Sequence, residues 1–583
     1  MKIFSINILA FLLLFAFAKT NAQNNFVITE TKKSIYKIVL PANPTLIEKE
    51  AAQVLSKYLA KVTGTELPIV SDSWQPYPFE ICIGNTNRSV KIFSSNTVQD
   101  ATYIGTKDKK IFINGGARKG VLYAAYTFLE KYVGCRKFTA NFEVIPNKPD
   151  LTVSLPYEDF YNPIFEYRSL DFKDIYNYQF ADWHKVNYFF ENRKNPAHSF
   201  FYYLPETLFK THPEYFSLVG GKRQPIQPCL SNPEVLKIIK ANLAIEMKKN
   251  PANHVWSVSQ IESDDYCHCN LCEPKHKAGN GFVETLIPFV NKLAEAFPNK
   301  TISTLAYRPT LKPPKNSRPQ QNVEIMFCFT HINRAMPIKT GIQGSKIFNG
   351  PDNAAMFRNI LADWKKLTNN IFAWDYVVNF TDTMSPFPNF KALQPNVQYM
   401  ADNNIKKLFL EGYGNQQGEF SELRTYILAK LLWNPNIDVE AITDEFISNY
   451  YGAAALEIKT YFSTLEDIVM RQGATVDIWA GNSLNANDFL SSNNIDTYNK
   501  LFERALSKVR NNETVYNRVL KEYLSVQYAE VQLAKKDPVR LKKMGGNKIL
   551  KNKINKLSDD AVKLGIEYFS FGHKTPNEYR QIE

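Results

Sequence analysis

The alternation of short apolar segments with amphipathic helical segments over residues 163–435 limits the fold more than any other feature of this sequence. Such alternation is typical of parallel strands joined by crossover helices, as in the predicted helices 281–297 and 389–402. A span of this length suits a closed (β/α)8 barrel better than an open sheet. We therefore predict an α/β fold with a central barrel. Seven strands can be placed, and an eighth cannot: 167–172, 187–190, 254–260, 302–307, 323–328, 371–378 and 406–410.

The regions on either side of this segment have different patterns. Before it, strand and helix signals alternate, and Thr45 with Glu48 forms a capping box for a helix that Gly64 ends. After Trp433 strand signals nearly vanish and amphipathic helices follow one another. We expect an N-terminal α/β accessory domain over residues 23–156, the barrel over 157–435 and a helical domain over 436–583.

The first residues predict export. Lys2 precedes an apolar run over residues 6–18, and small residues lead to a cleavage-like position after Ala22. The run is short for a bilayer span, which needs about 20 residues, so residues 1–22 are predicted as a cleaved signal peptide. We therefore expect a periplasmic or extracellular protein without a membrane span. The formal net charge of +13 is spread along the chain, and export argues against a nucleic-acid partner.

Carboxylates lie where two predicted barrel strands end, which is where barrel enzymes carry their chemistry. Glu262, Asp264 and Asp265 directly follow the strand that ends at Gln260. Glu411 ends another strand, and the nearby glycines let the backbone approach a ligand. Glycosidic cleavage commonly uses two carboxyl groups across the scissile bond. Glu262 and Glu411 are therefore the candidate catalytic pair, and a solvated acidic turn is the alternative for the first cluster.

Aromatic and polar residues near the same strand ends are candidates for binding a sugar. Trp374, Asp375 and Tyr376 are consecutive, and aromatic faces stack on sugar C–H surfaces. Tyr413 and Asp264 are further candidates, and a buried structural role for Asp375 stays open. Among the histidines, His198 is the one we select for ligand contact. The partner predicted from this set is a glycan, with no cofactor in the chemistry.

Four cysteines have spacing that is typical of a metal site. Cys267, Cys269 and Cys272 lie close together, and Cys229 precedes them. Four thiolates can hold a structural zinc ion, whereas export favours disulfides, with Cys229 pairing to one of the three. Both interpretations stay open, and a catalytic metal is not expected.

These residues belong to motifs that resemble a known family over almost the full chain. The N-terminal motifs look like the accessory domain of α-glucuronidases and hexosaminidases: Glu50-Ala-Ala52, Tyr58-Leu59, Thr63-Gly64, Leu67-Pro68-Ile69 and Gly120-Val-Leu-Tyr-Ala124. The middle is similar to domain of unknown function 4838, part of which became glycoside hydrolase family 163, through the following motifs: His212-Pro-Glu-Tyr-Phe216, Gly221-Lys-Arg223, Cys229-Leu-Ser-Asn-Pro233, Ser259-Gln260, Tyr266-Cys-His-Cys269 with Cys272, Leu305-Ala-Tyr307, Pro313-Pro314, Trp374-Asp-Tyr376, Pro386-Phe-Pro388 and Leu428-Ala-Lys-Leu-Leu-Trp433.

The resemblance implies a barrel hydrolase that acts as an endo-β-N-acetylglucosaminidase on complex N-glycans, as in gut bacteria of the Bacteroides type. It also implies that the cysteine cluster is a family feature. This chain departs from the family at Ile261 and Glu262, where Asn and Asp are expected after Ser259-Gln260. That departure keeps open a non-catalytic glycan-binding protein. An α-glucuronidase acting on acidic glycans is a further alternative, which Arg308 would favour if it faced the pocket.

Overall fold

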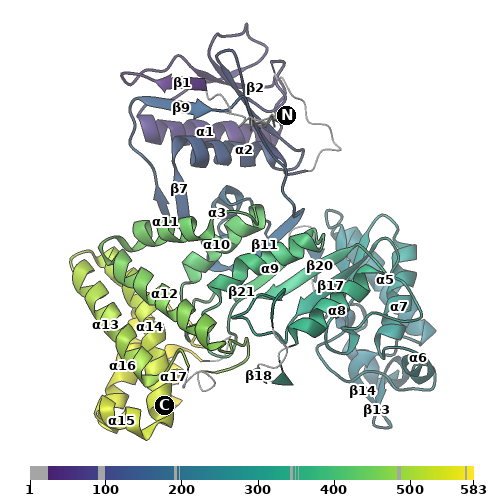
Figure 1. Cartoon of the computed structure of the whole chain (residues 1–583). Coiled ribbons are helices and arrows are strands. Elements are labelled where there is room, and N and C mark those ends of the chain that lie inside the picture. Colours follow the sequence, from purple (N-terminus) through teal and green to yellow (C-terminus); the bar gives the residue numbers. More distant parts are fainter. Residues whose placement is uncertain are drawn as a thin grey trace, which may run out of the picture. The chain divides into compact units, whose positions relative to one another are not determined.

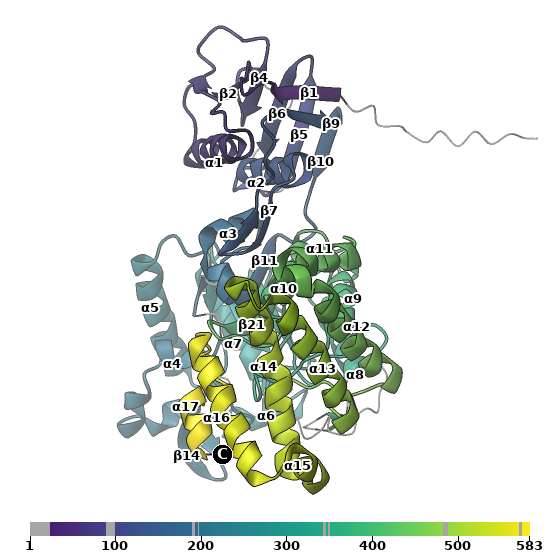
Figure 2. The same cartoon turned by 90° about the vertical axis from the view of Figure 1, so that its left-hand side faces the viewer.

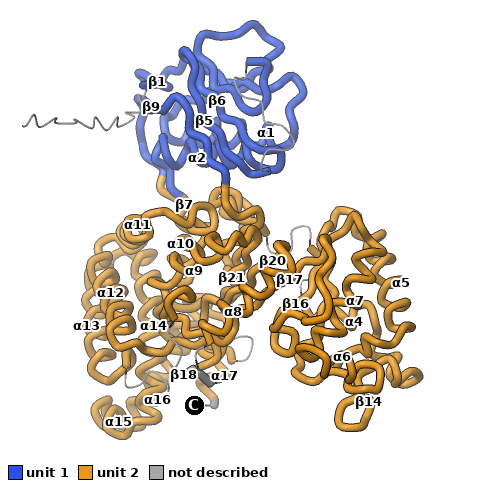
Figure 3. Tube along the Cα trace, turned by 45° about the vertical axis from the view of Figure 1, so that its right-hand side comes forward, with its two compact units in different colours: residues 1–136, 145–162 blue, residues 137–144, 163–583 orange. Residues whose placement is uncertain are grey.

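A computed structural model of the chain describes residues 24–88, 99–188, 193–195, 197–341, 346–347, 350–351, 353–481, 488–570 and 574–582. The predicted signal peptide, residues 1–22, lies outside these residues. The chain divides into two compact units, residues 1–136 with 145–162 and residues 137–144 with 163–583 (Figure 3). Among the described helices, none is long and apolar enough to cross a membrane.

The first unit contains a mixed sheet with the strand order β10-β5-β6-β4-β2-β3, and a separate antiparallel pair, β1 with β9. Helices α1 and α2 pack against each other and against this sheet (Figure 2). The bounds are β1 (Asn24–Thr29), β2 (Lys37–Leu40), α1 (Leu46–Thr63), β3 (Ile69–Ser71), β4 (Glu80–Ile83), β5 (Thr102–Lys107), β6 (Lys110–Gly115), α2 (Gly120–Phe128), β9 (Leu151–Leu155) and β10 (Glu158–Tyr161).

The ends of α1 follow from local chemistry, as the sequence predicts. The Thr45 side chain accepts a hydrogen bond from the backbone N–H of Glu48, and the Glu48 side chain accepts one from the backbone N–H of Thr45. Two N–H groups that the helix leaves unpaired are thereby satisfied. Gly64 ends the helix with φ at 71°, in the left-handed region that favours glycine. The predicted capping box is confirmed.

The second unit is built on a curled parallel sheet of seven strands, in the order β11-β21-β20-β17-β16-β15-β12. An isolated parallel bridge joins Ser169 in β11 to Asn187, shortly before β12, so the two edges of the sheet approach each other. The predicted strand 187–190 is replaced by this bridge and by β12, with 189–190 outside the described residues. The bounds are β11 (Tyr167–Phe172), β12 (Arg193–Lys194), β15 (Val255–Ser257), β16 (Thr301–Ala306), β17 (Val323–Phe329), β20 (Ile371–Tyr376) and β21 (Lys407–Gly414).

Helices and short hairpins connect these strands, and helices α8, α9 and α10 lie along them (Figure 1). The predicted helices 281–297 and 389–402 are confirmed as α7 and α9. The bounds are β7 (Arg136–Thr139), β8 (Phe142–Val144), α3 (Tyr178–Trp183), α4 (Phe200–Tyr203), β13 (Phe216–Val219), β14 (Lys222–Pro228), α5 (Pro233–Lys249), α6 (Glu273–Lys277), α7 (Val283–Ala296), β18 (Lys346–Ile347), β19 (Gly350–Pro351), α8 (Ala354–Lys365), α9 (Phe390–Asp402) and α10 (Ser421–Trp433).

The chain after α10 is helical in the described residues and belongs to the same compact unit as the sheet. One hydrophobic core runs from the sheet through Tyr426 of α10 and Phe446 of α11 to Phe502 of α13. The bounds are α11 (Val439–Tyr451), α12 (Ala455–Gln472), α13 (Ser492–Val509), α14 (Glu513–Lys536), α15 (Pro538–Met544), α16 (Asn547–Lys563) and α17 (Pro576–Ile582).

A buried group of charges lies at the beginning of the sheet strands. Glu324 of β17 accepts hydrogen bonds from both terminal nitrogens of Arg193 at 2.7 and 3.0 Å, and from Lys407 Nζ at 2.8 Å. The Ser303 hydroxyl donates to the same carboxylate at 3.0 Å. Burial alone would raise the pKa of Glu324, but Arg193 and Lys407 hold it well below its ordinary value. Glu324 and its three partners come from β12, β16, β17 and β21.

Candidate active site

The strand register brings three of the predicted site residues onto one face of the sheet. Tyr376 of β20 is paired with Glu411 of β21, and Trp374 is paired with Phe409. Side chains in register lie on the same face, and side chains two residues apart along a strand share that face. Trp374, Tyr376 and Glu411 therefore gather at the carboxyl ends of these two strands. The indole N–H of Trp374 donates a hydrogen bond to Glu411 Oε2 at 2.6 Å.

Glu411 has an unusual protonation equilibrium. Burial raises its pKa from 4.5 to about 8, and the charges of Asp171 and Glu262 also raise it, against the hydrogen bond from Trp374, which lowers it. The carboxyl group is therefore largely protonated at neutral pH. A protonated carboxyl group at a strand end can give its proton to a leaving oxygen.

Glu262 lies in the segment after β15 and is more open to solvent. Its side chain is 55% exposed. The Tyr307 hydroxyl donates to Glu262 Oε1 at 2.9 Å, and Arg308 Nη1 lies 3.8 Å from the same atom. Arg308 also holds Asp264 with two hydrogen bonds, at 2.9 and 2.6 Å. These bonds attach the segment that carries Glu262 to the residues that follow β16.

Sequence reasoning missed a third carboxyl group, Asp171. Leu170 of β11 is paired with Leu410 of β21, and the register shifts before the next pair, Phe172 with Gly414. Asp171 therefore lies at an irregularity in β11, beside the strand that carries Glu411. Burial raises the pKa of Asp171, and the hydrogen bond from the Tyr176 hydroxyl to Oδ1, at 2.7 Å, opposes this effect. The signal was present in the sequence as an acid between two apolar residues at the end of the first predicted barrel strand.

Glycine at position 414 keeps space open beside this third carboxyl group. A Cβ atom on Gly414 would stand 3.6 Å from Asp171 Oδ2. The φ of Gly414 is 60°, a backbone conformation that side chains other than glycine rarely adopt. The glycine that we predicted would let the backbone approach a ligand thus lies next to Asp171.

Three of the predicted sugar-binding residues lie inside the protein rather than on an open surface: Asp375, Tyr376 and Tyr413. Asp375 is 3% exposed, and its carboxylate accepts a hydrogen bond from Arg334 Nη1. Tyr413 is 1% exposed, and its ring meets the ring of Phe172 edge-on. Arg334 follows β17 and is itself buried, so the ion pair joins β20 to the segment after β17.

His198 lies beside the segment that carries Glu262. Its Nδ1–H donates to the carbonyl oxygen of Gln260 at 2.8 Å, and its ring lies 6.1 Å from that of Tyr307. His198 and Arg308 both have positive φ, at 49° and 52°. Such backbone conformations are uncommon for residues other than glycine and are enriched at functional sites.

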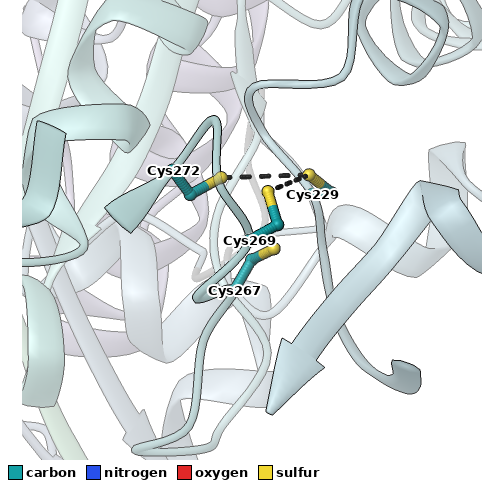
Figure 4. Close-up of side chains that lie close together, drawn as sticks. All are labelled: Cys229, Cys267, Cys269 and Cys272. Carbon is teal, nitrogen blue, oxygen red and sulfur yellow. Dashed lines mark hydrogen bonds between the residues drawn. The ribbon is translucent and has the colours of Figure 1, made fainter. Parts of the chain in front are cut away.

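Two groups of side chains among the described residues have ligand atoms close enough together to hold a metal ion. One contains the four cysteines singled out in the sequence, which are all buried (Figure 4). The other contains His268, Glu273 and His276. In the second group His276 Nε2 is already 3.0 Å from the Thr285 hydroxyl, and His268 Nδ1 is 2.7 Å from Glu273. Part of its hydrogen-bonding capacity is therefore used within the protein, while the buried Nδ1 of His276 has no hydrogen-bond partner among the described residues.

Comparison with known proteins gives a family and a fold. The model of a family described as domain of unknown function (DUF4838) matches residues 137–463. A search of curated proteins gives no match. A solved family GH115 4-O-methyl-α-glucuronidase with specificity for decorated arabinogalactans is 11% identical, with 96% of this chain and 80% of that chain covered and a TM-score of 0.55. At this identity the likeness concerns the fold alone.

Two further solved structures are similar at lower scores. CpGH84B is 12% identical, with 97% of this chain and 98% of that chain covered and a TM-score of 0.46. A GH138 enzyme that targets pectin rhamnogalacturonan II is 11% identical, with 94% of this chain and 97% of that chain covered and a TM-score of 0.45.

Proposed function

We propose that this chain, which belongs to the DUF4838 family, is a glycoside hydrolase with Glu411 as its general acid. The observation that carries the proposal is the state of Glu411. Burial and two neighbouring carboxyl groups keep it largely protonated at neutral pH, at the end of a strand in a curled parallel sheet. A carboxyl group kept neutral beside an ionised one is the arrangement that glycosidic cleavage uses.

In the proposed reaction Glu411 protonates the glycosidic oxygen as the bond to the anomeric carbon breaks. Glu262 supplies the second carboxyl group, held by the Tyr307 hydroxyl. It either attacks the anomeric carbon or takes a proton from the water that does so. A separation of about 5 Å between the two carboxyl groups favours attack and retention, and a wider one favours water and inversion. After attack by Glu262, the ionised Glu411 takes one proton from the water that hydrolyses the glycosyl–enzyme bond. After direct attack by water, the proton taken by Glu262 returns to Glu411 through solvent. In both cases the other water proton stays on the new sugar hydroxyl.

The substrate that we propose is a β-N-acetylglucosaminide in complex N-glycans. Trp374, which is partly exposed, shares the face of Glu411 and would form the aromatic side of the sugar site. The buried ring of Tyr376 lies 6.4 Å from that of Trp374. An acetamido group also allows its own carbonyl oxygen to act as the nucleophile, with a carboxylate polarising it. Asp171 lies on the neighbouring strand, and its charge raises the pKa of Glu411, so it is the residue suited to that role.

The state of Arg308 favours a neutral sugar over a uronic acid. Both oxygens of Asp264 accept hydrogen bonds from its guanidinium group. A uronate would have to replace Asp264 to bind Arg308. Arg308 is therefore not available as the cation that an α-glucuronidase would need for the carboxylate of its substrate. The proposal also places the enzyme outside the cytoplasm, after removal of residues 1–22.

Four variants test the assignment: Glu411→Gln, Glu262→Gln, Asp171→Asn and, as a control, Asp265→Asn. Each is incubated with complex N-glycans, glucuronoxylan and decorated arabinogalactan, and products are identified by mass spectrometry. We expect the wild type and Asp265→Asn to cleave N-glycans, and Glu411→Gln and Glu262→Gln to lose about 100-fold or more. If Glu262→Gln kept full activity and Asp171→Asn lost activity, Asp171 rather than Glu262 would be the second catalytic carboxyl group.

The same panel decides between the alternative functions. Cleavage of glucuronoxylan or arabinogalactan alone would replace the N-glycan proposal with an α-glucuronidase. Glycan binding by a folded wild-type protein without any cleavage would support a non-catalytic binding protein and refute the enzyme.

A further inference from the structure

The four cysteines come from two segments that are far apart in the sequence. Cys229 directly follows β14, and Cys267, Cys269 and Cys272 lie between β15 and α6. All four are at most 2% exposed. Figure 4 shows their sulfur atoms turned toward one another.

The distances between the sulfur atoms match a tetrahedral metal site. The sulfur atoms of the four residues all lie within 4.8 Å of one another. Cys229 Sγ is 3.6 Å from Cys269 Sγ and 3.8 Å from Cys272 Sγ. Four thiolates bound to zinc at about 2.3 Å stand about 3.8 Å apart along each edge of the tetrahedron. The side chains therefore have the spacing of zinc ligands before any ion is added.

The surroundings also suit a cluster of negative charge. Four thiolates with one Zn²⁺ carry a net charge of about −2, which needs hydrogen-bond donors when buried. The backbone N–H of Leu218 donates to Cys267 Sγ at 3.4 Å, and Arg223 Nη1 donates to the same atom at 3.8 Å. Leu218 and Arg223 belong to the β13–β14 hairpin, so the hairpin supplies the donors as well as leading to Cys229.

This part of the chain has little other core. The four cysteines form a buried cluster of their own, and the one partly buried hydrophobic side chain that packs against it among the described residues is that of Leu218. Small regions without a sizeable apolar core are commonly stabilised by a metal or by disulfides. We infer that Cys229, Cys267, Cys269 and Cys272 bind one structural Zn²⁺ ion, which replaces a hydrophobic core between the β13–β14 hairpin and the segment before α6.

The metal site has a consequence for Glu262, and this step depends on the proposed function. Glu262 and Asp264 precede Cys267 in the same segment after β15. The ion would attach the far end of this segment to β14, while Tyr307 and Arg308 hold its beginning. Loss of zinc should therefore release one of the two attachments of the segment that carries Glu262. Because Glu262 would then be held less firmly, the activity of the enzyme should fall.

The metal content of the full-length protein, without its signal peptide, tests the site directly. We expect about one zinc per chain by elemental mass spectrometry, and less than about a tenth of that in Cys269→Ser and Cys272→Ser. Cys82→Ala, which removes a buried thiol in the other compact unit, should keep the full content. Iron in place of zinc, or wild-type protein without metal, would overturn the inference.

A second measurement on the wild type covers variants that fail to fold. Chelation under argon should make four thiols newly reactive toward a thiol reagent, and added Co²⁺ should give the visible absorption of a tetrahedral thiolate site. If the thiols became reactive after reduction but not after chelation, the cysteines would form disulfides, and the zinc site would be refuted. Zinc without glycan cleavage would refute the proposed function alone, and cleavage without zinc would refute this inference alone.

Discussion

Glu411→Gln removes the ionisable group while keeping the shape of the side chain. The pKa of Glu411 is raised from 4.5 to about 8 in the folded protein. At 1.36 kcal/mol for each tenfold change, this difference corresponds to about 5 kcal/mol between the protonated and ionised states. The figure is an upper bound, because the side chain is only partly buried and solvent screens its charge.

The sign of the effect follows from the direction of the shift. A folded-state pKa above the unfolded value contributes stability that is fully present below pH 4.5 and is lost as the pH rises through about 8. The wild type should therefore lose free energy of unfolding between pH 5 and 9 relative to Glu411→Gln. Urea unfolding at pH 5, 7 and 9 measures this difference, with Glu567→Gln, an exposed carboxyl group, as the control. We expect the free energy of unfolding of the wild type to fall by at least about 1 kcal/mol relative to Glu411→Gln between pH 5 and 9, and by no more than the upper bound of about 5 kcal/mol.

The same variant tests the role of Glu411 in catalysis. In the wild type kcat/KM should fall as the pH rises through about 8, because the acid must be protonated. Glu411→Gln should lower kcat/KM by about 100-fold to 10,000-fold and abolish this dependence. The loss should be smaller for 4-nitrophenyl glycosides, whose leaving group needs no proton. An equal loss for both substrates, or an alkaline fall in activity that survives in the variant, would refute the reasoning.

Three further substitutions have expected outcomes. Trp374→Phe removes the N–H donor to Glu411 and with it a bond that lowers the pKa, so the fall in kcat/KM should move to higher pH; an unchanged profile would contradict this. Glu324→Gln leaves buried cations without their carboxylate and should cost about 3–5 kcal/mol in denaturant unfolding, and a loss below about 1 kcal/mol would argue against the ion cluster. Arg334→Met should cost a similar amount, and adding Asp375→Asn should restore part of it; a double-mutant cycle without coupling would speak against the ion pair.

Features that depend on neighbouring residues in the sequence could be predicted. The capping box of Thr45 and Glu48, the helices α7 and α9, and six of the seven predicted strands coincide with elements of the structure. Periodicity and caps are local, so a single sequence carries them. The strand 187–190 differs because pairing there is with β11 and β15, which the local sequence does not record.

The candidate site was only partly predictable, because its chemistry depends on contacts between distant segments. Nothing near Asp375 in the sequence indicates that Arg334 would pair with it, so sugar binding and a buried structural role both stayed open where burial is found. The raised pKa of Glu411 likewise depends first on its burial in the fold, and then on the charges of Asp171 and Glu262, which come from other segments. Strand-end position indicated which acids to consider, and the fold decides their charge states.

The buried charges around Glu324 fix how the strands are aligned along their length. A slip of β17 by one residue would turn the carboxylate to the opposite face and leave Arg193 and Lys407 without it. Since such a loss costs several kcal/mol, shifted pairings of four strands are excluded at the end of the sheet remote from Glu411. Strand alignment is thus set at the end of the sheet opposite to Glu411, so substitutions near Glu411 do not touch the ion pairs that fix it.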